Sequence, residues 1–119
     1  MINIKIQSVL EAIVSSFSPV VNTDVLPVTP FCVHDTKVAA TLRTKEGIYG
    51  FEYDLGVMVV GDTEEQIDPV VENIIDAIEM LSDGVIEECR FETMGGLQYD
   101  PDLLKFHNQL NFKVITNNL

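Results

Sequence analysis

The sequence has little of several features that mark particular classes of protein. Its 119 residues include no tryptophan, two cysteines and seven basic side chains against nineteen acidic ones. Two cysteines, Cys32 and Cys89, make neither a disulfide framework nor the spacing of a zinc site. No apolar run is long enough to cross a bilayer, and Met1–Lys5 has no signal-peptide pattern. We expect one domain, residues 1–119, made in the cytoplasm without a membrane partner.

The shortage of basic residues leaves a formal net charge of −12. A surface of that sign repels nucleic acid phosphates, so sequence-specific binding of DNA or RNA is not expected. Three explanations of the charge remain open. It can serve solubility, it can line a wall that DNA slides past, or it can imitate DNA in an inhibitor.

Catalytic signatures are also missing. The sequence has no GxGxxG, no Gly-Lys-Ser/Thr phosphate loop and no Gly-x-Ser-x-Gly. We therefore expect a protein that is not an enzyme and that binds no cofactor.

What the sequence does contain is one strongly patterned stretch, Tyr49–Leu81. Odd positions from Tyr49 to Val59 are all aromatic or aliphatic, whereas the even positions begin polar and end in Met58 and Val60. Alternate side chains of a strand point to opposite faces, so this pattern predicts a long strand with one apolar face. The apolar end of the other face must be covered within the subunit or by another copy.

After Gly61 the apolar residues repeat at three and four positions, which predicts a core-facing helix over Thr63–Leu81. Asp62 or Thr63 can cap it, with Glu65 or Gln66 three residues later. Pro69 predicts either a later start or an irregular first turn, and we favour the longer helix. Ser82 to Gly84 should end it.

The rest of the chain supplies one more helix, three more strands of the two hairpins and one short strand candidate. The helix is expected over Asn3–Phe17. A hairpin should join Ala39–Arg43 to the long strand across Thr44–Gly47. The remaining expected elements are a short strand Phe31–His34, a loop or bulge Asp35–Ala40, a strand Val85–Met94, a turn or bulge at Gly95-Gly96, a loop Leu97–Asp102, a strand from Leu104 and a frayed tail Thr116–Leu119.

The order is thus helix, hairpin, helix, hairpin (α-β-β-α-β-β). Each helix has one apolar stripe and each long strand one apolar face. These surfaces are buried together most simply in an α+β two-layer domain, with a mainly antiparallel four-stranded sheet and both helices on one face.

Two groups of side chains could carry chemistry. Cys32, His34 and Asp35 are close in sequence, and Cys89 and His107 could join them through the fold as metal ligands or as a nucleophile pair. Ordinary strand and surface positions are the simpler explanation. Glu52 and Asp54 share one strand face and could act as an acid/base pair or a metal-binding pair, but surface charges are again simpler.

Five residues are candidates for an interface with a neighbouring subunit. Met58 and Val60 form the apolar end of the polar strand face, and Asp62, Glu64 and Glu65 form the acidic turn that follows it. No catalytic, cofactor-binding or metal-binding residue is assigned.

Element order and apolar spacing together resemble the tail completion, or tail terminator, proteins of tailed bacteriophages and prophages. The resemblance covers most of the chain. The segments that carry it are Pro30–His34, Thr44–Gly47, Tyr49–Val60, Thr63–Leu81 and Leu103–Thr116.

This resemblance implies a structural protein of the virion tail or neck. Such proteins form rings, commonly hexamers, that cap the tail tube and join it to the head–tail connector proteins. DNA passes through the ring without specific binding. The alternative function is a small acidic adaptor or a DNA-mimic inhibitor that binds a protein partner.

Overall fold

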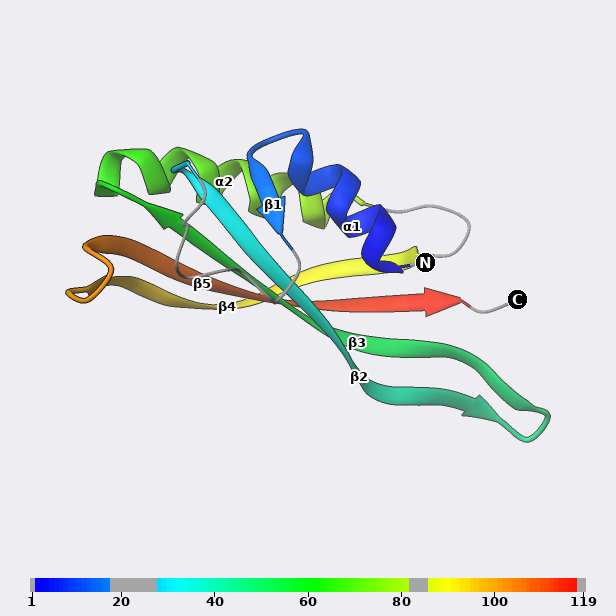
Figure 1. Ribbon diagram of the computed structural model, residues 1–119. Coiled ribbons are helices and arrows are strands. Elements are labelled where there is room, and N and C mark those ends of the chain that lie inside the picture. The colour runs from blue at the N-terminus through cyan, green and yellow to red at the C-terminus, as the bar shows by residue number, and fades with distance from the viewer. Residues whose placement is uncertain (1, 18–27, 82–85, 118–119) are drawn as a thin grey trace.

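The computed structural model describes residues 2–17, 28–81 and 86–117. In chain order the elements are α1 (Ile2–Glu11), β1 (Ser15–Phe17), β2 (Phe31–Thr44), β3 (Gly47–Gly61), α2 (Glu64–Glu79), β4 (Ile86–Asp100) and β5 (Lys105–Asn117). The strands form one sheet in the order β1-β2-β3-β5-β4, and both helices lie on the same face of it (Figure 1). The predicted α+β two-layer arrangement is therefore confirmed, but the sheet has five strands where four were predicted.

The additional strand is β1, and it overturns the prediction of a helix over Asn3–Phe17. The helix ends at Glu11, where the amides of Ile13 and Val14 both donate to the Leu10 carbonyl at 2.9 Å. Residues 15–17 then pair in parallel with residues 31–33 of β2. Those three residues give β2 a partner along its outer edge. This pairing is a tertiary contact, and three residues are too few to show a periodic pattern of apolar residues in the sequence.

Strand β2 is continuous, whereas the sequence predicted two strands separated by Asp35–Ala40. It pairs with β3 along its whole length, with register shifts at Val38/Ala40 and Leu42/Arg43, so the predicted bulge is present and the loop is not. Residues 37–41 are exposed on both faces. A strand with no buried face has no reason to alternate polar and apolar residues, which is why the pattern failed here.

The long strand agrees with its prediction and lies between β2 and β5. The turn before it uses Gly47 at φ +128°, a conformation that favours glycine. On the helix-facing side Leu55, Val57 and Val59 are buried, but Tyr49 at the start of the same face is 39% exposed. The helices thus cover only the second half of the apolar face.

Helix α2 begins as the longer of the two predicted forms, with Pro69 inside it. Thr63 is the N-cap: its Oγ1 accepts from the Gln66 amide at 3.3 Å, and Gln66 Oε1 accepts from the Asp62 amide at 2.7 Å. Ile67, Val71, Ile74 and Ile78 are its buried residues. The helix ends at Glu79 with Met80 as its C-cap, two residues before the predicted end at Leu81, and the predicted stop residues Ser82 to Gly84 lie outside the described residues.

The last hairpin is longer than predicted. At Gly95-Gly96 the register shifts by one extra residue, and β4 continues to Asp100, so the predicted loop from Leu97 is wrong at its start. The turn lies at residues 101–104, where Asp100 Oδ1 accepts from the Asp102 amide at 2.9 Å. Glycine allowed the chain to bulge without leaving the ladder.

The predicted frayed tail is wrong at its first two residues. Thr116 is 3% exposed and pairs with Phe51 and Ile86, and β5 continues to Asn117. Residues 118–119 lie outside the described part of the chain. The predicted alternation of β5 is confirmed, because Leu110, Phe112 and Val114 are buried.

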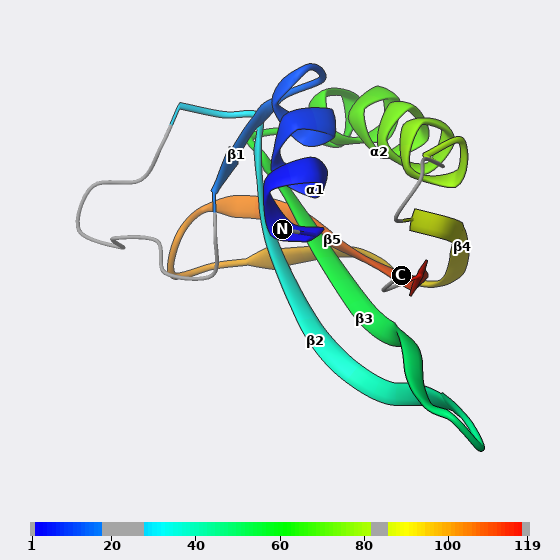
Figure 2. The same ribbon diagram turned by 90° about the vertical axis from the view of Figure 1, so that its right-hand side faces the viewer.

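The two hairpins extend to opposite ends of an elongated molecule of 52 × 26 × 22 Å (Figures 1 and 2). We call residues 38–51 of the β2–β3 hairpin the arm and residues 94–104 of the β4–β5 hairpin the tip. The helices pack over the middle of the sheet, where the buried core lies.

Candidate functional site

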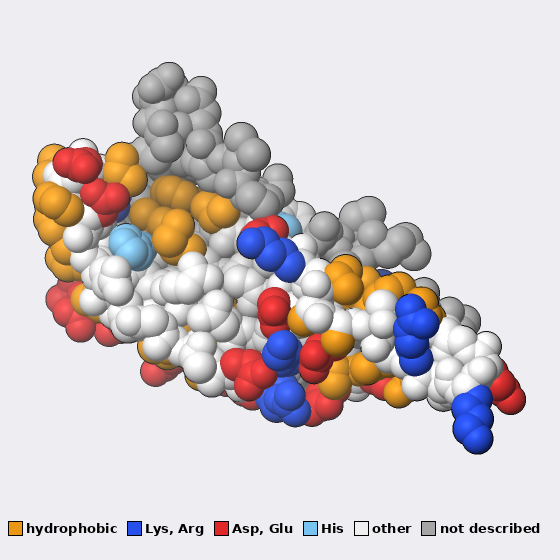
Figure 3. Space-filling view, turned by 90° about the horizontal axis from the view of Figure 1, so that it is seen from below, with side chains coloured by type: hydrophobic (Ala, Val, Ile, Leu, Met, Phe, Trp, Pro, Cys, Tyr) orange, Lys and Arg blue, Asp and Glu red, His pale blue; other side chains and the backbone are white. Residues whose placement is uncertain are grey.

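The face of the sheet away from the helices carries many of the polar residues singled out by the sequence (Figure 3). A groove of about 670 Å³ lies on this face, where β2, β3, β5 and β4 adjoin. Gly56 leaves room in the groove for the side chain of Gln109, since a Cβ at position 56 would come 2.9 Å from Gln109 Nε2. Asn111 Nδ2 donates to Thr93 Oγ1 at 3.0 Å, so amide and hydroxyl groups line this part of the groove and satisfy one another.

Charged side chains beside the groove form cross-strand ion pairs. Lys113 Nζ lies 2.6 Å from Asp54 Oδ1 and 3.8 Å from Glu52 Oε2. The hydrogen bond that Lys113 donates to Asp54 is the main reason that the pKa of Lys113 lies above its usual value. Glu52 and Asp54 do share a face, as predicted, but there they hold a lysine that the sequence analysis did not pair with them.

Met58 and Val60, two of the candidate interface residues, lie on the same open face of β3. Met58 is half-buried and lines the groove. Val60 is 7% exposed within the chain, next to Phe31 and His107 in the sheet register. Of the two, Met58 has more surface to offer a neighbour.

The other three candidates lie where β3 joins α2. Asp62 pairs with Lys105 through Oδ1, and its Oδ2 accepts from Thr29 Oγ1 at 2.7 Å. The bonds from Lys105 and then Thr29 hold the pKa of Asp62 below its usual value. Glu64 and Glu65 are exposed in the first turn of α2, where the helix dipole favours negative charge.

The candidate metal or nucleophile residues do not come together. Cys32 and His34 share the helix-facing side of β2, as predicted, and both are buried, but Asp35 lies on the opposite face. Cys89 is on β4, three strand spacings from β2, or about 14 Å. His107 is on the open face of β5. Within residues 2–17, 28–81 and 86–117, no three His, Cys, Asp or Glu side chains are grouped to hold a metal ion.

His34 instead takes part in a polar network that the sequence analysis did not find. His34 Nε2 lies 2.6 Å from Gln7 Oε1, and because an amide oxygen only accepts, the imidazole donates. Gln7 Nε2 donates to Glu11 Oε1 at 2.7 Å and to the Ser16 carbonyl at 3.0 Å. The network joins α1, β1 and β2. Its one local signal is the four-residue spacing of Gln7 and Glu11.

Burial also changes the titration of the two neighbouring groups on β2. It raises the pKa of the Cys32 thiol and lowers the pKa of His34. A thiol kept protonated is a poor nucleophile, so Cys32 behaves as a core residue. No helix in the described part of the chain is long and apolar enough to span a membrane.

No protein-family model matches this chain, and no curated protein sequence does.

Its fold, however, occurs in a virion. A chain from a structure described as the virion of a native gene transfer agent particle superposes with a TM-score of 0.66. The match covers 94% of this chain and 84% of the other, at 15% sequence identity. The likeness establishes a shared fold across nearly the whole chain.

Proposed function

We propose that this chain is a structural protein of a tailed phage or phage-like particle, and specifically its tail terminator. In this role it caps the tail tube, stops its growth and joins it to the head–tail connector proteins. It acts as a ring in the neck of the virion, made in the cytoplasm of the bacterial host. It catalyses no reaction.

The observation that carries the proposal is the shared fold. The match to a chain of a gene transfer agent virion spans 94% of this chain, so it includes both helices and both long hairpins. The order of elements and their apolar spacing also resemble the tail completion family. Fold alone does not fix function, so the specific role needs its own test.

The side chains support a structural role. The one close carboxylate pair that the sequence offered as an acid/base site, Glu52 and Asp54, is paired with Lys113. The buried thiol and imidazole on β2 face the helices and pack within the core side of the sheet. These groups are thus accounted for by contacts within the sheet and its core, which supports a structural role.

Deletion of the gene from the phage or prophage that carries it tests the proposal. We expect tail tubes of uneven, excessive length that do not join to heads, and restoration by the wild-type chain. Immunogold labelling should place the protein at the neck of purified particles. Tails of normal length joined to heads, or particles without the protein, would contradict the proposal.

A second candidate function is supported by the surface of α2. Its outer face carries six acidic residues and no basic one: Glu64, Glu65, Asp68, Glu72, Asp76 and Glu79. Rows of carboxylates can imitate the phosphates of DNA for a protein that binds DNA. An acidic inhibitor would bind such a protein tightly in a purified mixture and would be absent from purified particles.

A further inference from the structure

Exposed apolar side chains are concentrated at the two ends of the molecule. Within the described residues, eight of the ten exposed large hydrophobic side chains belong to the arm or the tip. Those of the arm are Val38, Ile48 and Tyr49, and those of the tip are Met94, Leu97, Tyr99, Leu103 and Leu104. Clustered apolar surface of this kind marks a contact with another molecule.

The outer part of the arm extends beyond the rest of the sheet. The pairing of β3 with β5 stops at Gly50 and Asn117, so beyond that point only β2 and β3 pair among the described residues. Val38 lies further in, on β2 opposite Tyr53. No helix packs over the arm (Figures 1 and 2). Val38 is 59% exposed and Tyr49 39%, although Tyr49 continues the apolar face that is buried further along β3. The apolar face of β3 therefore continues into the arm, where no helix covers it.

The tip lies toward the other end of the β3–β5 ladder. Its β4 residues from Met94 onward pair with β5, and its turn at residues 101–104 lies beyond the last β3–β5 pair, Gly61 and Phe106. The start of α2 is at the same end, joined to it by the Asp62–Lys105 ion pair. We call residues 62–65 together with the tip the acidic end. It contains five carboxylates and no basic residue: Asp62, Glu64, Glu65, Asp100 and Asp102.

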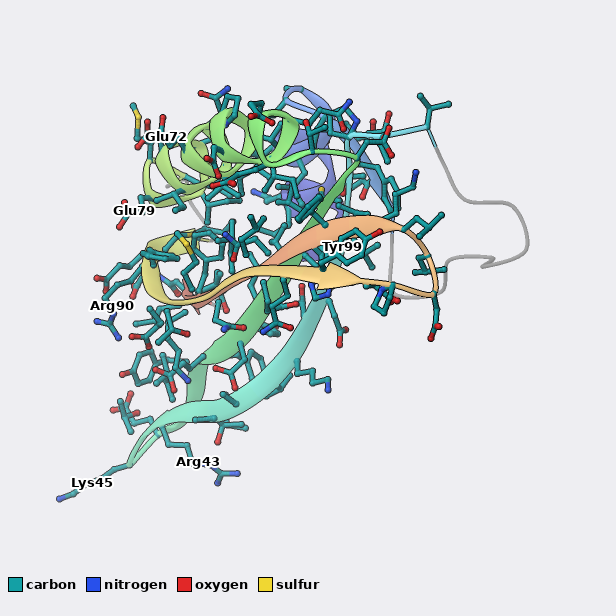
Figure 4. The ribbon with its side chains drawn as sticks, turned by 90° about the vertical axis from the view of Figure 1, so that its left-hand side faces the viewer. Arg43, Lys45, Glu72, Glu79, Arg90 and Tyr99 are labelled. Carbon is teal, nitrogen blue, oxygen red and sulfur yellow. The ribbon has the colours of Figure 1, made fainter. Side chains whose placement is uncertain are left out.

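The arm has the opposite charge. It carries Arg43 and Lys45 against Glu46 alone, in a chain whose net charge is −12. Both basic side chains project from the end of the hairpin, away from the sheet and helices (Figure 4). Neither forms an ion pair among the described residues with the carboxylates of its own chain.

We propose that the arm binds a second copy of this chain, and that the arm of one copy docks against the acidic end of the next. The inference rests on the proposed function, because it names the contact by which the ring would form. Since the two surfaces differ and lie at opposite ends, the contact is head-to-tail and repeats around a closed ring. Apolar side chains fill the centre of the contact, and Arg43 and Lys45 meet the carboxylates around it.

Nucleic acid is the other partner that two basic side chains could suggest. Phosphate backbones are bound by many cationic groups, whereas the arm offers two, on a hairpin that also exposes Val38, Ile48 and Tyr49. Those apolar side chains have matching apolar side chains on the acidic end of another copy. The surfaces therefore favour protein over DNA.

Charge reversal on each side tests the contact with the purified full-length chain. Arg43→Glu with Lys45→Glu reverses the arm, and Asp102→Lys with Glu64→Lys reverses the acidic end. Each variant alone places like charges in contact and should raise the dissociation constant for self-association at least about tenfold. An equimolar mixture of the two variants puts opposite charges together at every contact and should restore association. Sedimentation velocity up to about 1 mM chain measures all three.

Matched controls change the same number of charges elsewhere. Lys37→Glu with Arg90→Glu is the control for the arm, and Glu72→Lys with Glu79→Lys is the control for the acidic end; all four side chains are exposed. The controls should associate like the wild type, and every variant should keep its melting temperature within a few degrees. A variant that fails to fold is replaced by Tyr49→Ser for the arm or Leu104→Ser for the tip.

Several results would overturn the contact. They are a wild-type chain that stays monomeric at about 1 mM, reversed variants that associate normally, or a mixture that fails to restore association. Binding of labelled duplex DNA by the wild type but not by the arm variant would assign the arm to DNA instead. If reversed variants still terminate tails of normal length in cells where deletion does not, the proposed function stands and this contact is wrong.

Discussion

Lysine is scarce in this chain, and the lysines of the sheet lie beside carboxylates. Lys105 pairs with Asp62, Lys113 with Asp54 and Glu52, and Lys37 lies 3.8 Å from Asp35. Each of these groups keeps some contact with solvent, from about a quarter of the Lys105 and Lys113 side chains to most of Lys37, and ion pairs at the surface add little to stability. Their effect is on position: Lys105 ties the last strand to the start of α2, and Lys113 links two central strands.

The Asp62 carboxyl group gives a prediction about its own pKa. Lys105 and Thr29 hold its pKa below the usual value, so its carboxylate should titrate at lower pH than a free aspartate. Lys105→Met removes the first of these causes and should move the midpoint upward. NMR titration of the Asp62 carboxyl carbon measures both, and an unchanged midpoint in the variant would contradict the ion pair.

His34 gives a prediction for stability against pH. Burial lowers its pKa in the folded chain, with Asp35 acting weakly in the other direction. As the pH falls, His34 is therefore protonated first in the unfolded chain, near pH 6.5. The contribution of the neutral His34 to the free energy of unfolding is complete above that pH and is lost as the pH falls through the pKa of the folded chain.

His34→Gln keeps a donor for Gln7 and removes the titration. Between pH 7 and pH 5, urea unfolding should show a larger loss of stability in the wild type than in His34→Gln. The remaining loss in the variant measures the carboxylates, which both proteins share. Parallel losses in the two proteins would show that His34 does not titrate in this range.

At the scale of elements, helix α2 depends on one buried stripe and one cap. Ile74 is fully buried against the sheet, so Ile74→Ala should destabilise the chain by about 2–5 kcal/mol. Tyr53 is only half-buried at the edge of the core, so Tyr53→Ala should cost less. Thermal and urea unfolding measure both, and an Ile74→Ala variant as stable as the wild type would contradict the packing of α2.

The cap of the same helix has its own test. Thr63 Oγ1 accepts from the Gln66 amide, and Thr63→Ala should cost about 1 kcal/mol. Thr63→Ser keeps the hydroxyl and is the matched control. Equal loss in both variants would assign the effect to the methyl group of Thr63 and not to the cap.

The elements that sequence periodicity predicted well are those with one face buried against something else. Helix α2 and the strands β3 and β5 each show this, and their predicted faces match the buried residues Leu55, Ile74 and Phe112. The failures have the opposite cause. β2 beyond Asp35 is exposed on both faces, and β1 is a three-residue strand defined by its parallel partner. Neither the exposure of β2 on both faces nor the parallel pairing of β1 can be predicted from the local spacing of apolar residues.

The candidate site was predicted less completely than the fold. Shared strand faces, such as that of Glu52 and Asp54, follow from the two-residue period and were foreseen. Partners from other strands were not, because register decides whether Lys113 or another residue lies opposite. The exposed arm was also missed, since its aromatic residues continue the pattern of a core face. Only the extent of the helices shows that this part of the face is uncovered.

For the whole molecule, the net charge of −12 governs the affinity for DNA. Binding to duplex DNA gains free energy by releasing counterions from phosphates that basic groups neutralise. Here the basic residues are few, and Lys105 and Lys113 are already paired with carboxylates. We therefore expect no measurable binding of duplex DNA at physiological salt.

Fluorescence anisotropy with a labelled duplex, at several salt concentrations, measures this expectation. Glu72→Lys with Glu79→Lys reduces the net charge from −12 to −8 on the outer face of α2, and it should gain affinity only at low salt. Tight binding by the wild type, falling steeply with salt, would show that the molecule presents a concentrated basic surface. If Arg43→Glu with Lys45→Glu abolished that binding, the DNA would lie on the arm, and the arm would be removed from the contact between copies.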